Sequence, residues 1–286
     1  MSEVPRSAGP QTTRRSPVRS NNPVLTGRNA FTYYNPNQQG GSGQTDVYGY
    51  QTAHGYTPQP QQATGRMTID DVITKTAILL LIMIAAGGVT WLLLPVSLLY
   101  PVAIIGSLVA FVTVWIVSMR KNVSVPGVFA YAVVEGLMLG AWSKIFEYMY
   151  PGIVVQAVIG TFVAAFVVLG AYKFLGARVR GRLAQIVVVS IIAYAVMSLL
   201  NLILIFAGVN LGWATIGANA GPLSWLSAGL GVVLAAASLL MDFEAIEVGV
   251  RGGAPESESW RGAFGLLVTM VWLYTTLLRI LSFFRN

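Results

Sequence analysis

Long apolar runs alternate with short polar connections through the chain after residue 66. Each run is about twenty residues long, which is the length a helix needs to cross a hydrocarbon core about 30 Å thick. Backbone groups in that core must bond within their own segment, and the unbroken Leu, Val, Ile and Ala runs lack the alternation of barrel strands. The pattern therefore predicts an all-α integral membrane protein with a seven-helix transmembrane domain. Within residues 66–286 we expect helices at 72–94, 97–119, 126–149, 153–174, 185–207, 221–245 and 262–284.

The first 65 residues have a different composition from the rest. They are rich in Pro, Gln, Gly, Ser and Asn, with almost no aliphatic clustering. Such a segment buries too little apolar surface to offset the entropy of ordering it, so residues 1–65 are predicted to be a disordered tail. It also lacks the short apolar core of a cleavable signal peptide, so we expect the first helix to direct insertion.

Basic residues mark alternate connections between the apolar runs and so predict the orientation. They are Arg66 and Lys75, then Arg120 and Lys121, then Lys173, Arg178, Arg180 and Arg182, and finally Arg251 and Arg261. The other connections, near Pro95, Pro151 and residues 210–219, contain no Lys or Arg. Positive connections stay in the cytoplasm, so we expect a cytoplasmic amino terminus and an outside carboxyl terminus in the cell (inner) membrane.

Composition narrows the classes of function. The chain is 55% hydrophobic and 10% charged, and topology accounts for its net charge of +7, so nucleic acid is not an expected partner. It has no cysteine, and its one histidine, His54, lies in the tail, which argues against thiolate or histidine metal sites in the membrane. Asp242 is the only aspartate within the membrane runs, so no catalytic aspartate pair is present there. We therefore expect no enzyme activity and no resident cofactor.

Two ionisable residues in the apolar runs stand out, because such groups usually face the bundle interior and mark a pathway or switch. Glu135 lies about 14 Å into its helix, at 1.5 Å per residue, and is either a protonated carboxyl bonded to a neighbouring helix or part of a pore or proton relay. Arg279, in the outer half of the last helix, either reaches the outer surface or pairs with an acid inside the bundle. Near the outer end of the third run, Lys144 and Glu147 have the spacing of an ordinary ion pair.

Asp242 follows the apolar run GLGVVLAAASLLM and precedes Glu244 and Glu247 at the cytoplasmic end of its helix. Negative charge at the carboxyl end of a helix is opposed by the helix dipole, so another interaction must justify it. Because Asp242 is the deepest of the three, we predict that it is a gate or sensor.

Four stretches carry a resemblance to a known family: YAVVEGLMLG (131–140), MDFEAIEVG (241–249), WLYTTLLRILSFF (272–284), and SNNPVL (20–25) in the tail. They resemble the Bax inhibitor-one family, also called the transmembrane Bax-inhibitor-motif proteins, in its actinobacterial type. The resemblance implies six helices around a central carboxyl-terminal helix. It also implies a pH-sensitive calcium leak, and some bacterial relatives interact with a membrane protease.

The resemblance also implies a sensor from which this sequence departs. In family members with the leak, an aspartate on the sixth helix shares a proton with one on the seventh. Asp242 matches the first, but Thr276 stands at or beside the second, and a hydroxyl cannot share a titrating proton. Calcium prefers several anionic oxygen ligands, so we expect weaker calcium attraction and altered pH gating. Glu135 is a candidate second carboxylate if it faces the same cavity, and Asp242 meets Thr276 only if the sixth helix continues past Ala245.

The leading hypothesis is a pH-sensitive cation leak, with Asp242 and Thr276 at the gate and Glu135 and Arg279 along the pore. Calcium is then the transported ion, and Asp242 and Glu135 would be weak contacts for it rather than a fixed metal site. A second hypothesis is a regulatory membrane protein that binds a membrane protease or another membrane protein. A third is a proton-coupled transporter in which Glu135 and Asp242 relay protons.

Overall fold

The computed structural model describes residues 65–120 and 123–285, so the predicted disordered tail lies, but for Gly65, outside the described residues. The described chain is helical throughout, with no β-strand, and each of its seven long helices is long and apolar enough to cross a membrane. This confirms the predicted all-α membrane fold. The helices are α1 (Ile69–Leu93), α2 (Leu99–Met119) after a short 3₁₀ turn η1 (Val96–Leu98), α3 (Val125–Met149), α4 (Ile153–Phe174), α5 (Arg182–Phe206), α6 (Pro222–Arg251) and α7 (Glu258–Phe283).

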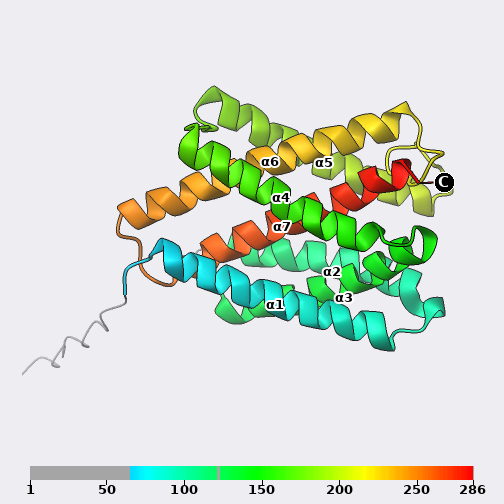
Figure 1. Ribbon diagram of the computed structural model, residues 1–286, viewed down its shortest axis with the longest axis horizontal. Coiled ribbons are helices and arrows are strands. Elements are labelled where there is room, and N and C mark those ends of the chain that lie inside the picture. The colour runs from blue at the N-terminus through cyan, green and yellow to red at the C-terminus, as the bar shows by residue number, and fades with distance from the viewer. Residues whose placement is uncertain (1–64, 121–122, 286) are drawn as a thin grey trace, which may run out of the picture. The chain divides into compact units, whose positions relative to one another are not determined.

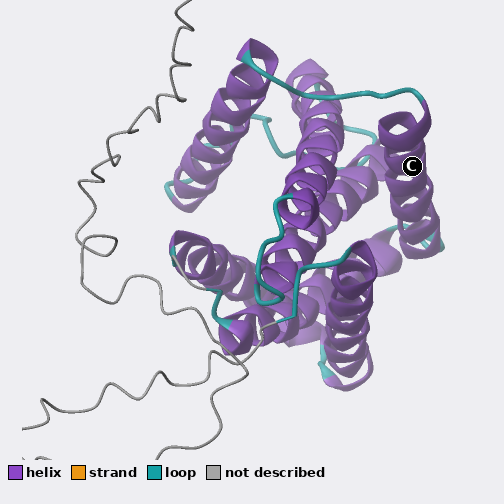
Figure 2. Cartoon of the chain, turned by 90° about the vertical axis from the view of Figure 1, so that its left-hand side faces the viewer, coloured by secondary structure: helices purple, strands orange, loops and turns teal. Residues whose placement is uncertain are grey.

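α7 lies among the other helices of the bundle (Figures 1 and 2). It packs closely against α1, α3, α4 and α6. Side chains extend its contacts to the outer pair of helices: Trp272 stacks near Tyr194 of α5, and Val117 of α2 shares a core cluster with Phe264. Half of the membrane-spanning windows of α3 and α7 are buried, against 11% for α2 and α5. The last helix is therefore central, as the family resemblance implied.

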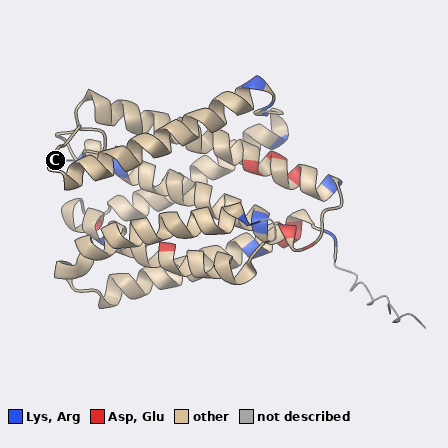
Figure 3. Ribbon diagram, turned by 180° about the vertical axis from the view of Figure 1, so that it is seen from behind, with Lys and Arg blue, Asp and Glu red and all other residues tan. Residues whose placement is uncertain are grey.

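Charged residues gather at one end of the bundle (Figure 3). This end holds the beginning of α1 and the α2–α3, α4–α5 and α6–α7 connections, and we call it the basic end. The chain leading into α1 is fastened there to the α6–α7 connection: Arg66 and Pro255 form a bridge, and the Met67 N–H donates to the Ala254 carbonyl (2.8 Å). The beginning of the bundle is thus joined to the α6–α7 connection at this end.

α6 and α7 extend furthest beyond their predicted bounds at the basic end. α6 continues through Arg251, past the expected end at Ala245, and α7 begins at Glu258 rather than at residue 262. The added turns contain charged residues, so an apolar window does not detect them. Ion pairs stabilise the added turn of α6, where Glu247 pairs with Arg251 (2.5 Å) and with Arg178 of the α4–α5 connection (3.0 Å).

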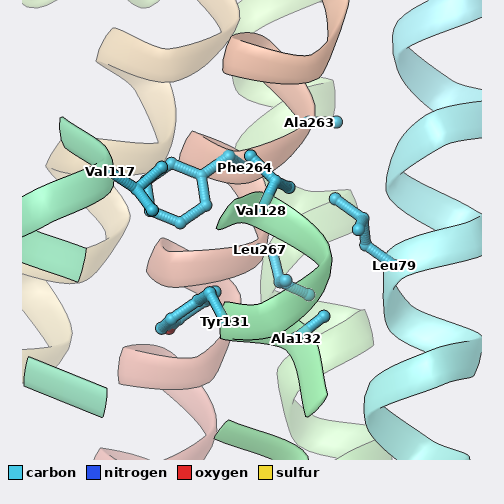
Figure 4. Packing of buried hydrophobic residues seen from close by; sticks show 8 residues of the cluster. All are labelled: Leu79, Val117, Val128, Tyr131, Ala132, Ala263, Phe264 and Leu267. Atoms are coloured by element: carbon cyan, nitrogen blue, oxygen red, sulfur yellow. The ribbon is translucent and has the colours of Figure 1, made fainter. Parts of the chain in front are cut away.

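An apolar cluster joins α1, α2, α3 and α7 on the basic side of the bundle centre (Figure 4). Its buried members are Leu79, Val117, Val128, Tyr131, Ala132, Ala263, Phe264 and Leu267. The rings of Tyr131 and Phe264 meet edge to face, with their centroids 5.1 Å apart. Aromatic pairs prefer this geometry, so the cluster fixes α3 against the central helix.

Glycines set the distance between α1 and α3. A Cβ atom at Gly136 would collide with the Met83 carbonyl, and one at Gly140 would collide with the backbone of Gly87. Small residues allow membrane helices to approach closely, and dispersion contacts then stabilise the pair. The tight contact between α1 and α3 therefore depends on these two glycines.

We expect Gly136→Ala to lower the melting temperature of the purified protein, because overpacking of a close interface costs about 1–3 kcal/mol. Gly229→Ala of α6 is the matched control, since a Cβ there meets no atom within 4 Å. Thermal unfolding in detergent, followed by circular dichroism, compares the two. Equal melting temperatures for Gly136→Ala and Gly229→Ala would contradict the proposed packing.

Candidate functional site: two cavities along the central helix

Asp242 lies between α6 and α7 and is bonded to the central helix. The Thr269 hydroxyl donates to its Oδ2 atom (2.6 Å), and Ser238 of α6 lies 3.5 Å from that hydroxyl. On the other side Gly265 leaves room for the carboxylate, since a Cβ there would lie 3.3 Å from Asp242 Oδ1. The carboxylate thus faces α7, as a gate between these helices requires.

Thr276 is not the partner of Asp242, which corrects the prediction from sequence. Its hydroxyl donates to the Trp272 carbonyl in its own helix (2.8 Å). Thr276 is seven residues, or about 10 Å, further along α7 than Thr269. The α6–α7 hairpin explains the register: Asp242 lies nine residues before the end of α6 at Arg251, and Thr269 lies eleven residues after the beginning of α7 at Glu258. Antiparallel helices joined by a short connection bring such equidistant positions together.

Asp242 lines a cavity of about 510 Å³ that extends toward the basic end, which we call the basic cavity. Glu258 and Arg261 are the other charged residues of its lining, and they pair with each other (2.7 Å). Met67, before α1, and Ala254, in the α6–α7 connection, also line it. The basic cavity therefore contains Asp242 together with an ion pair near its end.

Glu135 lies in a different cavity, of about 470 Å³, further along the bundle. Its side chain is buried, with 5% of the residue exposed. Thr276, Arg279 and Tyr194 line the same space, which we call the far cavity. The structure thus brings Glu135, Thr276 and Arg279 together but leaves Asp242 apart from them. Glu135 is therefore not the second carboxylate beside Asp242.

Among the described residues, Arg279 is bonded to the beginning of α6 rather than to an acid. Its guanidinium donates to the Ser227 hydroxyl (2.5 Å) and the Ser224 carbonyl (3.2 Å) in the first turns of α6. Its Nε atom is buried without a hydrogen-bond partner, and Arg279 forms no salt bridge within residues 65–120 and 123–285. The far cavity therefore holds one basic and one acidic side chain that are not bonded to each other.

An apolar layer separates the two cavities. Val114 of α2 and Val268 of α7 line both of them, while Tyr131 lines the far cavity and Phe264 the basic one. Along α7 the basic cavity takes residues 258–269 and the far cavity residues 268–279, so the two lie in series. The two cavities are therefore separate spaces in series along α7, with these apolar side chains between them.

The other acids of α6 do not face the basic cavity. Glu244 pairs with Arg180, and Glu247 accepts from the Tyr172 hydroxyl and pairs with Arg178. The Arg178 guanidinium also lies 3.6 Å from the centre of the Tyr172 ring. These contacts fasten the α4–α5 connection to α6, a role that the sequence did not reveal.

The expected ion pair between Lys144 and Glu147 is also replaced by other bonds. The Lys144 ammonium donates to the carbonyls of Trp91 (2.7 Å) and Leu94 (2.8 Å) at the end of α1. Glu147 instead accepts from two backbone N–H groups at the beginning of α4 (2.6 and 3.1 Å). Both side chains thus bond backbone groups that a helix end leaves without an intrahelical partner.

No group of three or more His, Asp or Glu side chains gathers into a metal site in the part of the chain that the structure describes. Calcium binds six to eight oxygen atoms in a fixed site. The single carboxylate of Asp242 with the Thr269 hydroxyl falls well short of that set. These residues suit a passing cation better than a resident one.

In a comparison with protein families, the chain matches the sequence model described as Bax inhibitor 1 like over residues 22–286. The match covers all seven helices and begins within the SNNPVL segment of the tail. A comparison with curated proteins found no match to this chain.

Proposed function

This chain belongs to the Bax inhibitor 1-like family, and on that premise we propose that it is a pH-sensitive cation leak with calcium as the transported ion. The seven apolar helices and the family together make it a multi-pass membrane protein. We place it in the cell (inner) membrane with the basic end in the cytoplasm, because positive connections stay on that side.

The main support is the position of Asp242. Among the described residues it is the acidic residue of the basic cavity that forms no salt bridge, and it shares that cavity with Val114 and Val268, beyond which the far cavity begins. An ionised carboxylate there attracts a cation to the layer from the basic end. The hydrogen bond between Asp242 and Thr269 also links α6 to the central helix. A change in the charge of Asp242 therefore also changes the contact between α6 and α7.

Protonation of Asp242 gives the leak its pH response. At higher pH the carboxylate is ionised and attracts cations, so flux is larger. At lower pH the neutral form removes that attraction, so flux falls. Glu258 and Arg261, the other charged groups of the basic cavity, pair with each other. Their opposite charges largely cancel at a distance, so they contribute little to the attraction of cations.

The far cavity limits the leak. Arg279 places a positive charge in the same space as Glu135, so a cation that crosses the apolar layer meets repulsion as well as attraction. Charged groups in membranes act over several ångströms because the surroundings screen them weakly. The chain is thus suited to a slow leak rather than to a rapid, highly selective channel.

We expect Asp242→Asn to lower calcium flux in proteoliposomes about tenfold at neutral pH, a change of about 1.4 kcal/mol, because one attracting charge is lost. The flux of this variant should no longer change with pH. Asparagine still accepts the Thr269 bond, so the helix contact is kept. Glu244→Gln is the control, because Glu244 pairs with Arg180 away from the cavity. Flux and pH response equal to wild type in Asp242→Asn would contradict the role of Asp242, and saturable counterflow of a solute would instead indicate a transporter.

The register of α6 and α7 gives a second test. Thr269→Asp places two carboxylates side by side, and they cannot both ionise readily, so one proton is held to higher pH and the midpoint of the flux–pH curve should move to higher pH. Thr276→Asp adds the same group about 10 Å away along the helix and should leave the midpoint unchanged. Flux against pH for the two variants decides between the positions. A shifted midpoint in Thr276→Asp alone would show that the register is wrong.

A further inference from the structure

An apolar groove runs between α1 and α4 on the membrane-facing side of the bundle. Each of these helices packs on α3 and α7 rather than on the other. The space between them has a volume of about 300 Å³, and its floor includes Gly140 of α3 and Val271 and Tyr274 of α7. The groove is separate from both cavities described above, although Val271 also lines the far cavity.

The two walls of the groove are regular helical stripes. On α1 the stripe runs from Leu80 to Trp91 at spacings of three and four residues, and on α4 it runs from Val154 to Phe162. Residues at this spacing lie on one face of a helix. An apolar stripe normally packs on another helix, yet here the two stripes face each other across open space.

The lining of the groove offers water few hydrogen-bond partners. Its three hydroxyl groups already have partners: Ser143 and Tyr274 bond each other (2.7 Å), and Thr161 donates to the Ala157 carbonyl (2.7 Å). Cavities lined by apolar side chains stay dry and accept apolar ligands. The chemistry of the groove therefore selects a hydrocarbon occupant.

The length of the groove matches one leaflet of a bilayer. From Leu80 to Trp91 α1 rises about 16 Å, and half of a hydrocarbon core is about 15 Å. The groove ends at the end of α1, which lies opposite the basic end. A single acyl chain that descends from that side would fill it.

The positively charged side chain of Lys144 lies beside the mouth of the groove. Lys144 bonds the carbonyl of Trp91, a groove residue, and that of Leu94. An ammonium group has three donors, so one remains after these two bonds. Lys144 forms no salt bridge among the residues that the structure describes. Its remaining donor and its charge suit a phosphate at the membrane surface.

We propose that this groove binds one phospholipid molecule, with an acyl chain between α1 and α4 and the phosphate at Lys144. The chain packs against Val271, whose other side faces the far cavity. The lipid thereby completes the wall of the central helix where no protein helix covers it. This inference does not depend on whether the protein conducts ions.

Native mass spectrometry tests the proposal after purification from membranes of phosphatidylethanolamine and phosphatidylglycerol. We expect the wild-type protein to retain one phospholipid and Gly88→Phe to retain at least tenfold less, because a side chain at Gly88 meets no atom within 4 Å and extends into the groove. Gly229→Phe is the matched control, since it also meets no atom within 4 Å but lines none of the three cavities, and it should retain lipid as wild type does.

Two further variants keep the test decisive if Gly88→Phe does not fold. Val158→Trp fills the groove from the α4 wall and should also expel the lipid. Lys144→Met leaves the groove open and should lower the fraction of phosphatidylglycerol among the retained lipids. The proposal is wrong if the wild type retains no phospholipid, if groove-filling variants retain as much as wild type, or if Gly229→Phe loses as much as they do.

Discussion

Hydrocarbon cannot bond polar groups, and this constraint determines where α7 lies. α7 carries Thr269, Thr276 and Arg279, and each of these side chains finds its partner within the protein. Exposed to lipid, an unbonded polar group would cost several kcal/mol. The helix is therefore enclosed by its neighbours, and α3, which carries Glu135, is equally buried. The more uniformly apolar α2 and α5 occupy the outside.

The same constraint shapes the interior. Both cavities lie beside polar side chains of the central helices, with Glu135, Thr276 and Arg279 at one and Asp242 and Thr269 at the other. Where the facing residues are Val114, Val268, Tyr131 and Phe264, the packing closes again. Along α7, polar side chains thus lie on both sides of the apolar layer. The apolar layer is the part of the interior that packs like an ordinary core.

Much of this architecture could be predicted from sequence, because apolar runs and the alternation of basic connections can be read along the chain without knowing any tertiary contact. The partner of Asp242 could not be predicted from the family motif, which pointed to Thr276. Counting residues from the α6–α7 turn would have found Thr269, but only with the ends of both helices known, and those ends are polar turns held by ion pairs. Lys144 and Glu147 show the same limit, because their partners are backbone groups of other helices, which a sequence spacing does not reveal.

The central place of α7 has a consequence for how the protein is made. α7 is synthesised after the six helices that surround it, so those six enter the membrane before the centre of the bundle exists. Until α7 arrives, α1 has no α6–α7 connection to bridge at Arg66, and the polar faces of α3 and α6 lack the side chains that later bond or cover them. The contacts that enclose α7 can therefore form only after the seventh helix has been synthesised.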